Sequence, residues 1–218
     1  MNTKGKVGCG CLFMILVILM VFVGILAHPF SLRLIGRQFR YGDKIFKSDI
    51  IFVPRFHEDK KGEVYLEAFR EYWSGNGNKI CIEDDELMGI GMIEIVTRMA
   101  KARGIKSDAI TKIEANGERD EKTGKIVEGL IKLGAKKVII IVPEYASRRF
   151  HLIYNSKGYS NKIVFMIRPV AVSYFKMDRW WRESGSRMII IKEIGSIGSF
   201  YFNRFKYGDK KQNQGSEK

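Results

Sequence analysis

Short apolar runs alternate with segments of helical periodicity along most of the chain. The runs are rich in β-branched residues, and the segments between them repeat apolar side chains every three or four positions. This alternation is typical of parallel strands that are covered by helices on both faces. We therefore predict an α/β domain, a Rossmann-like three-layer sandwich with a mainly parallel sheet and right-handed crossovers.

Five runs predict strands, and four periodic segments predict the helices between them. The strands are expected within residues 48–54, 75–83, 108–115, 136–142 and 161–175. The helices are expected around residues 63–73, 92–103, 126–133 and 150–154. The run Val138–Val142 is the most uniformly apolar of the five, and we expect it to form the central strand.

The N-terminal segment differs from the rest because it is apolar without interruption. No Lys, Arg, Asp or Glu occurs from Val7 to Leu32, and Cys11–Ala27 is almost wholly apolar. About 20 helical residues span the core of a bilayer, and backbone groups in lipid must bond within the segment. We predict a transmembrane helix over residues 9–30, after a short tail over residues 1–8.

A cleaved signal peptide is the alternative for this segment, with Lys4 and Lys6 as its charged start. The sequence His28-Pro29 is a poor context for cleavage after Ala27, and the apolar run is longer than a usual signal core. The sequence gives two opposing signals for the orientation of this helix in the membrane. The basic residues after the helix favour a cytoplasmic domain, whereas a short charged start before a single apolar run also builds a signal-anchor.

Charge and composition define the remaining organisation. The chain has 218 residues and a formal net charge of +14, which indicates an anionic partner such as phospholipid headgroups, phosphorylated molecules or nucleic acid. The apolar segment favours the membrane, and we predict no nucleic-acid partner. Residues 31–47 are expected to be a juxtamembrane linker on anionic headgroups, residues 48–206 a single domain, and residues 207–218 a disordered tail.

Two adjacent arginines follow the most apolar strand. In open α/β sheets, ligands bind beyond the carboxyl ends of the strands, and Tyr145, Ser147, Arg148 and Arg149 lie at such an end. If Ser147 caps the following helix, its free N–H groups and a guanidinium together form an anion site. Adjacent helical residues point about 100° apart, so only one arginine faces the crevice. The alternative is that both arginines are solvated surface residues.

Other candidate chemistry is sparse. No histidine pairs with another histidine or with cysteine at metal-ligand spacing, so no metal site is predicted. His57, Glu58 and Asp59 follow the first strand, where a solvated loop is expected. The sequence contains no nucleophile elbow, P-loop or GxGxxG motif, and it identifies no cofactor.

Three stretches resemble the ElyC/SanA/YdcF-like family of bacterial envelope proteins. They are "VIIIVPEYASRRFHLIYNSKGY", "GIKSDAITKIEA" and "DRWWRESGSRMIIIKEIGSIGSFYF". The resemblance implies that Tyr145, Arg148, Arg149 and Glu121 belong to a ligand site, and Arg55 follows the first strand at the same edge. The chain departs from the family pattern at Val53-Pro54-Arg55, which replaces a Gly-Gly turn, and at Ala146, which replaces a histidine.

The resemblance implies a single-pass protein of the bacterial inner membrane, with its domain in the periplasm and a role in envelope or cell-wall integrity. The expected activity is binding of an anionic or phosphorylated envelope precursor or lipid carrier. A hydrolase or transferase acting on such a molecule is an alternative, and so is a non-catalytic interaction domain whose site has decayed. The sequence does not determine the oligomeric state.

Overall fold

The computed structural model describes residues 4–84, 86–87, 90–115, 117, 119–156 and 159–213. Its main strands are β1 (Ser48–Val53), β2 (Gly77–Asp84), β5 (Ile110–Glu114), β6 (Lys137–Pro143) and β7 (Val164–Val170). A small hairpin joins β3 (Glu86–Leu87) to β4 (Ile90–Gly91). The helices are α1 (Lys4–Ala27), α2 (Pro29–Arg37), α3 (Glu63–Trp73), α4 (Met92–Lys101), α5 (Arg119–Lys132), α6 (Ser147–Ser156) and α7 (Ser184–Asn213).

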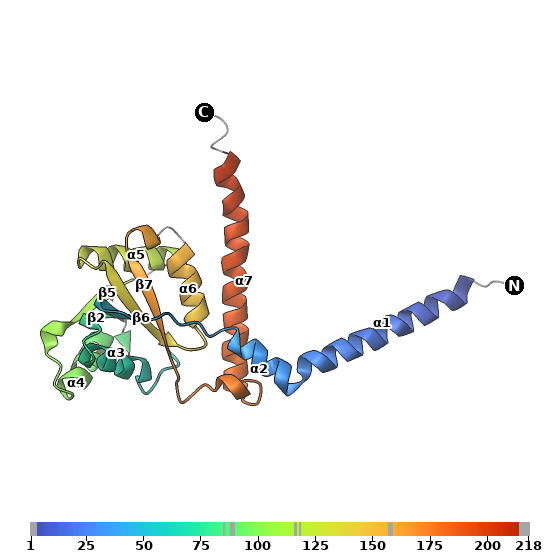
Figure 1. Ribbon diagram of the computed structural model, residues 1–218, viewed down its shortest axis with the longest axis horizontal. Coiled ribbons are helices and arrows are strands. Elements are labelled where there is room, and N and C mark those ends of the chain that lie inside the picture. Colours follow the sequence, from blue (N-terminus) through green and yellow to red (C-terminus); the bar gives the residue numbers. More distant parts are fainter. Residues whose placement is uncertain are drawn as a thin grey trace.

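The five main strands form one parallel sheet in the order β5-β2-β1-β6-β7. Helices α3 and α4 cover one face, and α5 and α6 cover the other (Figure 1). This is the predicted α/β, Rossmann-like arrangement. Strand β1 occupies the middle of the sheet, so the prediction that Val138–Val142 is the central strand was wrong by one position. Both runs are fully buried, and hydrophobic pattern alone does not distinguish neighbouring interior strands.

The core lies on both sides of β1 and β6. Ile51 and Phe52 from β1 and Ile139 and Ile140 from β6 have no exposed surface. Burying each of these side chains contributes about 1.5–3 kcal/mol. The long stretches of β-branched residues therefore build the sheet because helices remove water from both of its faces.

Helix α1 contains Gly10–Ala27, which is long and apolar enough to cross a membrane, and none of this window is buried against the rest of the protein. The helix ends at Ala27, and α2 begins after a bend at His28 (Figure 1). The His28 side chain accepts a hydrogen bond from the Phe30 N–H, and Pro29 is the first residue of α2. Proline is favoured at this position because its missing N–H would have no helical partner.

Helix α2 is fixed to the domain by close packing. The indole N–H of Trp180 donates to the Leu32 carbonyl oxygen at 2.7 Å. Gly36 is buried, and a Cβ at this position would lie 2.8 Å from the Met177 carbonyl oxygen and 2.8 Å from the Trp180 ring. Helix α2 is therefore packed on the segment that precedes α7.

The chain after α2 is bound along the edge of the sheet. The Asp43 N–H donates to the Ile167 carbonyl oxygen of β7, and the Asp43 carboxylate accepts the Ile167 N–H. The Tyr41 N–H donates to the Ser147 hydroxyl oxygen at 2.8 Å. These bonds cover the exposed edge of β7, and they tie part of the predicted linker to the domain.

Helix α7 closes the fold against α6, with its buried face formed by Ser186, Ile189, Ile190 and Glu193. It continues to Asn213, past residue 206, where the sequence placed the start of a tail. Residues 1–3 and 214–218 of the predicted tails lie outside the described residues.

Candidate functional site

A cavity of about 350 Å³ opens at the carboxyl edge of the sheet, between the ends of β1 and β6. Crossovers leave these neighbouring strands in opposite directions, and such a switch point is where open α/β sheets bind ligands. We call this space the edge cavity. The residues that line it are Pro54, Arg55, Phe56, His57, Glu58, Glu83, Lys122, Thr123, Ile126, Tyr145, Arg149, Phe150, Ile153, Tyr154, Ile189, Lys192, Glu193 and Ser196.

Aromatic rings form much of the inner wall. The Phe56 ring lies 5.7 Å from the Phe150 ring and 6.4 Å from the Tyr145 ring, and the Phe150 and Tyr154 rings stack at 5.9 Å. The Tyr145 and Tyr174 hydroxyl oxygens are 3.3 Å apart. Burial, reinforced by Tyr174, raises the pKa of Tyr145, so its phenol stays protonated and available as a hydrogen-bond donor.

A two-pronged ion pair lies on one side of the cavity. The Nε and Nη2 atoms of Arg149 donate to the two carboxylate oxygens of Glu193 at 2.8 and 3.0 Å. The guanidinium also lies over the Phe150 ring, 4.8 Å from its centroid. The Arg149 side chain is 18% exposed and the Glu193 side chain 7% exposed, so the pair is largely shielded from water. Paired bonds of this kind hold the guanidinium plane in one orientation.

Two further ion pairs lie around the same space. Glu83 is buried, forms an ion pair with Lys122 and accepts the backbone N–H of Arg55 at 3.1 Å. Lys192 lies 3.7 Å from Glu58. With Arg55, the cavity lining contains four positively charged side chains and three carboxylates. The edge cavity thus has an excess of one positive charge over a partly apolar wall.

This arrangement suits a small ligand with an anionic end and an apolar body. Ligand cavities of this size usually combine an apolar lining with a few oriented polar groups. An anion that reaches Arg149 must share the guanidinium with Glu193, so its binding is weaker than at an uncompensated arginine. Within the described part of the chain, no group of three or more His, Cys, Asp or Glu side chains is placed to hold a metal ion.

The structure brings together three of the predicted site residues, Arg55, Tyr145 and Arg149, around the edge cavity. Glu121 is outside it, where its side chain is 59% exposed and pairs with Lys125 one turn along α5. The next residue on the helix, Lys122, faces the cavity instead. Whether these residues bind a ligand stays a prediction.

Ser147 and Arg148 also lie outside the lining. The Ser147 side chain is fully buried, and its hydroxyl donates to the Glu144 carbonyl oxygen at 2.8 Å while accepting the Tyr41 N–H. It therefore holds the chain after α2 against the domain, in place of capping free N–H groups of α6. The Arg148 N–H donates to the Phe39 carbonyl oxygen at 3.1 Å. The two arginines thus differ in direction, as expected, and Arg149 is the one that faces the cavity.

Sequence reasoning missed several lining residues. His57 and Glu58, expected in a solvated loop, line the cavity, while the Asp59 carboxylate accepts two backbone N–H groups at the start of α3, each at 2.9 Å. Lys192 and the Glu83–Lys122 pair were not predicted. The adjacent charges Lys192-Glu193 within an apolar helix were the signal for this wall, because such charges favour solvent unless they are paired.

Comparisons with family models, with curated proteins and with solved structures find no match for this chain. The resemblance to the ElyC/SanA/YdcF-like family therefore stays a prediction.

Proposed function

We propose that this protein is anchored to a membrane by α1 and binds the phosphorylated or otherwise anionic end of a small amphiphilic molecule in the edge cavity. The observation that carries the proposal is the position of Arg149. Its guanidinium lies at the switch point of the sheet, held in a fixed plane beside a partly apolar wall. Planar guanidinium groups recognise phosphate through paired hydrogen bonds.

The cavity supports binding over a decayed site. A site that had lost its ligand is free to fill with apolar side chains, yet four cations and three carboxylates remain around an open space. Three of these charged side chains, Glu83, Arg149 and Glu193, are largely buried, and keeping them costs stability because desolvation offsets much of their attraction. Ligand binding would explain why these charged side chains are kept, because an anion that enters the cavity contacts positively charged groups held in fixed positions.

The anchor and the resemblance together suggest the biological setting. We place the domain outside the cytoplasm of a bacterium, attached to the inner membrane, with an envelope precursor or lipid carrier as the ligand. A reporter enzyme that is active only outside the cytoplasm should be active when fused after Lys218. Activity of a cytoplasm-only reporter would reverse this orientation without affecting the cavity.

Binding is tested on the full-length protein in a nonionic detergent, by calorimetric titration with inorganic pyrophosphate at fixed salt. The substitution Arg149→Gln removes one positive charge from the cavity and leaves a side chain that can still donate a hydrogen bond to Glu193. Losing the guanidinium contact, about 1.5–3 kcal/mol, should weaken binding at least about tenfold. Arg148→Gln, which removes one positive charge outside the cavity, is the matched control and should change binding little.

The opposite result is equally clear. Similar losses in both variants, or losses that follow net charge and disappear at moderate salt, would indicate a diffuse basic surface. The proposed site would then be wrong.

A further inference from the structure

Helix α7 carries a second apolar face, which the domain does not cover. At about 100° per residue, six apolar side chains between positions 188 and 205 share one side of the helix, whereas Lys192, Glu193 and Arg204 within this stretch point to other sides. Each is at least half exposed, up to 77% for Phe205. We call this face the outer stripe: Met188, Ile191, Ile194, Tyr201, Phe202 and Phe205.

The outer stripe points away from the domain. The buried side of α7, formed by Ser186, Ile189, Ile190 and Glu193, packs against the cavity and α6. On a helical projection the centre of the outer stripe lies about 130° around the axis from the centre of this buried side. A continuous exposed apolar face normally marks an interaction surface, and no segment in the described part of the chain covers the outer stripe, whose side chains stay at least half exposed.

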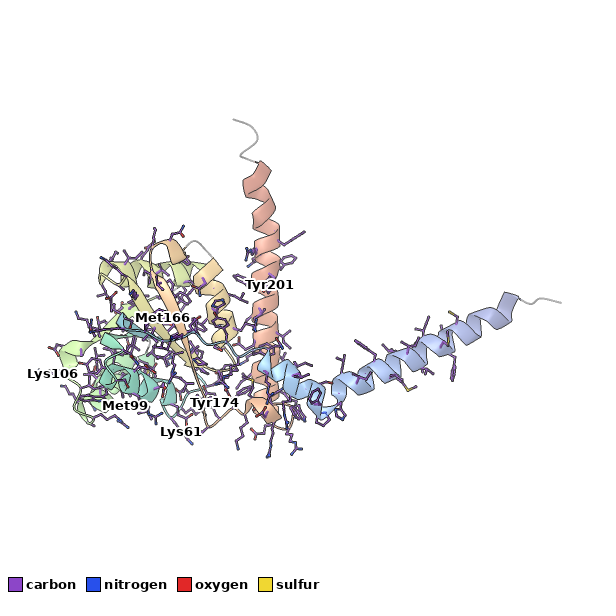
Figure 2. All side chains as sticks on the ribbon, viewed as in Figure 1. Lys61, Met99, Lys106, Met166, Tyr174 and Tyr201 are labelled. Atoms are coloured by element: carbon purple, nitrogen blue, oxygen red, sulfur yellow. The ribbon has the colours of Figure 1, made fainter. Side chains whose placement is uncertain are left out.

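The position of α1 indicates what covers it. Figure 1 shows α7 between the sheet and α1, and running across the direction of α1. A helix that spans a bilayer lies on average about 20° from the membrane normal, so a helix that crosses its direction lies along the membrane plane. Tyr201 lies near the middle of α7 (Figure 2). Because the buried side of α7 faces the domain, and α7 lies between the domain and α1, the outer stripe is turned toward the side of α7 on which α1 lies (Figure 1).

Helix α2 connects α1 to the domain and holds α1 and α7 in these relative positions. Trp180 and Gly36 fix α2 to the segment directly before α7, and α2 follows α1 after one bend. Phe30 and Leu34 on α2 are also exposed, at the level where α1 ends. An open concavity beside α2 is lined by the four cations Arg37, Arg40, Lys176 and Arg179 and by the two carboxylates Glu144 and Asp178. Arg37 and Arg40 form ion pairs with these carboxylates, and the remaining excess of positive charge suits anionic headgroups.

We infer that α7 lies in the headgroup region of an anionic bilayer, with the outer stripe in contact with lipid. This inference rests on the proposed anchoring by α1. Interfacial helices bury an apolar face that carries aromatic and aliphatic side chains, and the outer stripe has both over about 26 Å of helix. Because the opposite face of α7 forms a wall of the edge cavity, that cavity sits beside the membrane surface and is open to amphiphilic ligands from the lipid.

The test uses the full-length chain in vesicles of phosphatidylcholine with a minority of phosphatidylglycerol. Cys9, Cys11 and Cys81 are replaced by serine or alanine, and single cysteines carry nitroxide labels. The labels are placed at Phe202 on the outer stripe, at the exposed neighbour Asn203, and at Val17 inside α1. Spin-label saturation then compares collisions with oxygen, which concentrates in lipid, and with a water-soluble nickel chelate.

The expected result is a lipid-like ratio of oxygen to nickel collisions at Phe202 and Val17, and a water-like ratio at Asn203. A water-like ratio at Phe202 with a lipid-like ratio at Val17 would overturn the inference but leave the anchor intact. A water-like ratio at Val17 would remove both the anchor and the inference. Broadening at Phe202 that disappears on dilution with unlabelled protein would show that a second copy covers the stripe, which also overturns it.

Discussion

Replacing Glu193 by glutamine should make the protein less stable and, at the same time, a better anion binder. Arg149 donates two hydrogen bonds to the Glu193 carboxylate, at 2.8 and 3.0 Å. Glutamine keeps one oxygen acceptor but loses the charge and the second acceptor. A hydrogen bond to a charged group contributes about 1.5–3 kcal/mol, and Arg149 retains some contact with water, so we expect a loss near the lower value.

The corresponding shift in melting temperature is about 3–6 °C for a domain of this size. The gain in affinity has an electrostatic origin. A carboxylate about 6 Å from a bound anion opposes it by about 2–3 kcal/mol at an effective dielectric constant of 20. Removing that charge and releasing one side of the Arg149 guanidinium should tighten pyrophosphate binding by about tenfold or more.

Both quantities are measured on the full-length protein in detergent, by circular dichroism melting and by calorimetric titration. Glu121→Gln is the matched control, because it removes the same charge from an exposed pair on α5 that lies outside the cavity. It should change neither quantity appreciably. An unchanged melting temperature in Glu193→Gln would show that the pair is not formed, and an unchanged affinity would show that Arg149 does not meet the anion.

Three other perturbations test the fold. Ile140→Asp, in the buried part of β6, should prevent folding because an unpaired carboxylate there costs several kcal/mol, whereas Val164→Asp at a half-exposed position of β7 should leave soluble, folded protein. Gly36→Leu should release α2 from the domain, because the new Cβ would overlap the main chain before α7, and cleavage by trypsin near α2 should increase. The control Gly24→Leu, at a position with open space around it, should not increase this cleavage. Two backbone N–H groups lower the pKa of Asp49, so its stabilisation is fully present only above about pH 5 and is lost as the pH falls through the lowered value. Asp49→Asn should therefore reduce the dependence of the melting temperature on pH at the acid end.

The sequence predicted the sheet well because burial on both faces leaves a local signature. The apolar runs at β1 and β6, and the helical spacing around Phe69 and Leu130, depend on neighbours in the chain. The order of the strands depends on pairing between distant segments, and the run at β6 therefore appeared more central than it is.

The part of the site that the sequence predicted follows from one rule, that ligands of open α/β sheets bind beyond the carboxyl ends of the strands. That rule placed Tyr145 and Arg149 at the correct edge. It did not reveal the Glu83–Lys122 pair, whose partners meet only after β2 and α5 are packed. It also did not reveal that the C-terminal helix returns to form a wall, because the same apolar pattern fits a helix on either side of the sheet.

Hydrogen bonds between Tyr41 and Ser147, and between Asp43 and Ile167, hold the chain after α2 against the domain. A domain on a flexible linker can reach targets at a distance from its anchor. The length of the linker then sets the effective concentration of the domain around those targets. In this protein the segment after α2 is hydrogen-bonded to the domain, so it cannot act as a flexible tether and the domain stays next to α2. With α1 in a membrane, as we propose, this packing sets the height of the domain above the lipid, and a ligand must reach the cavity by diffusion in the plane of the membrane.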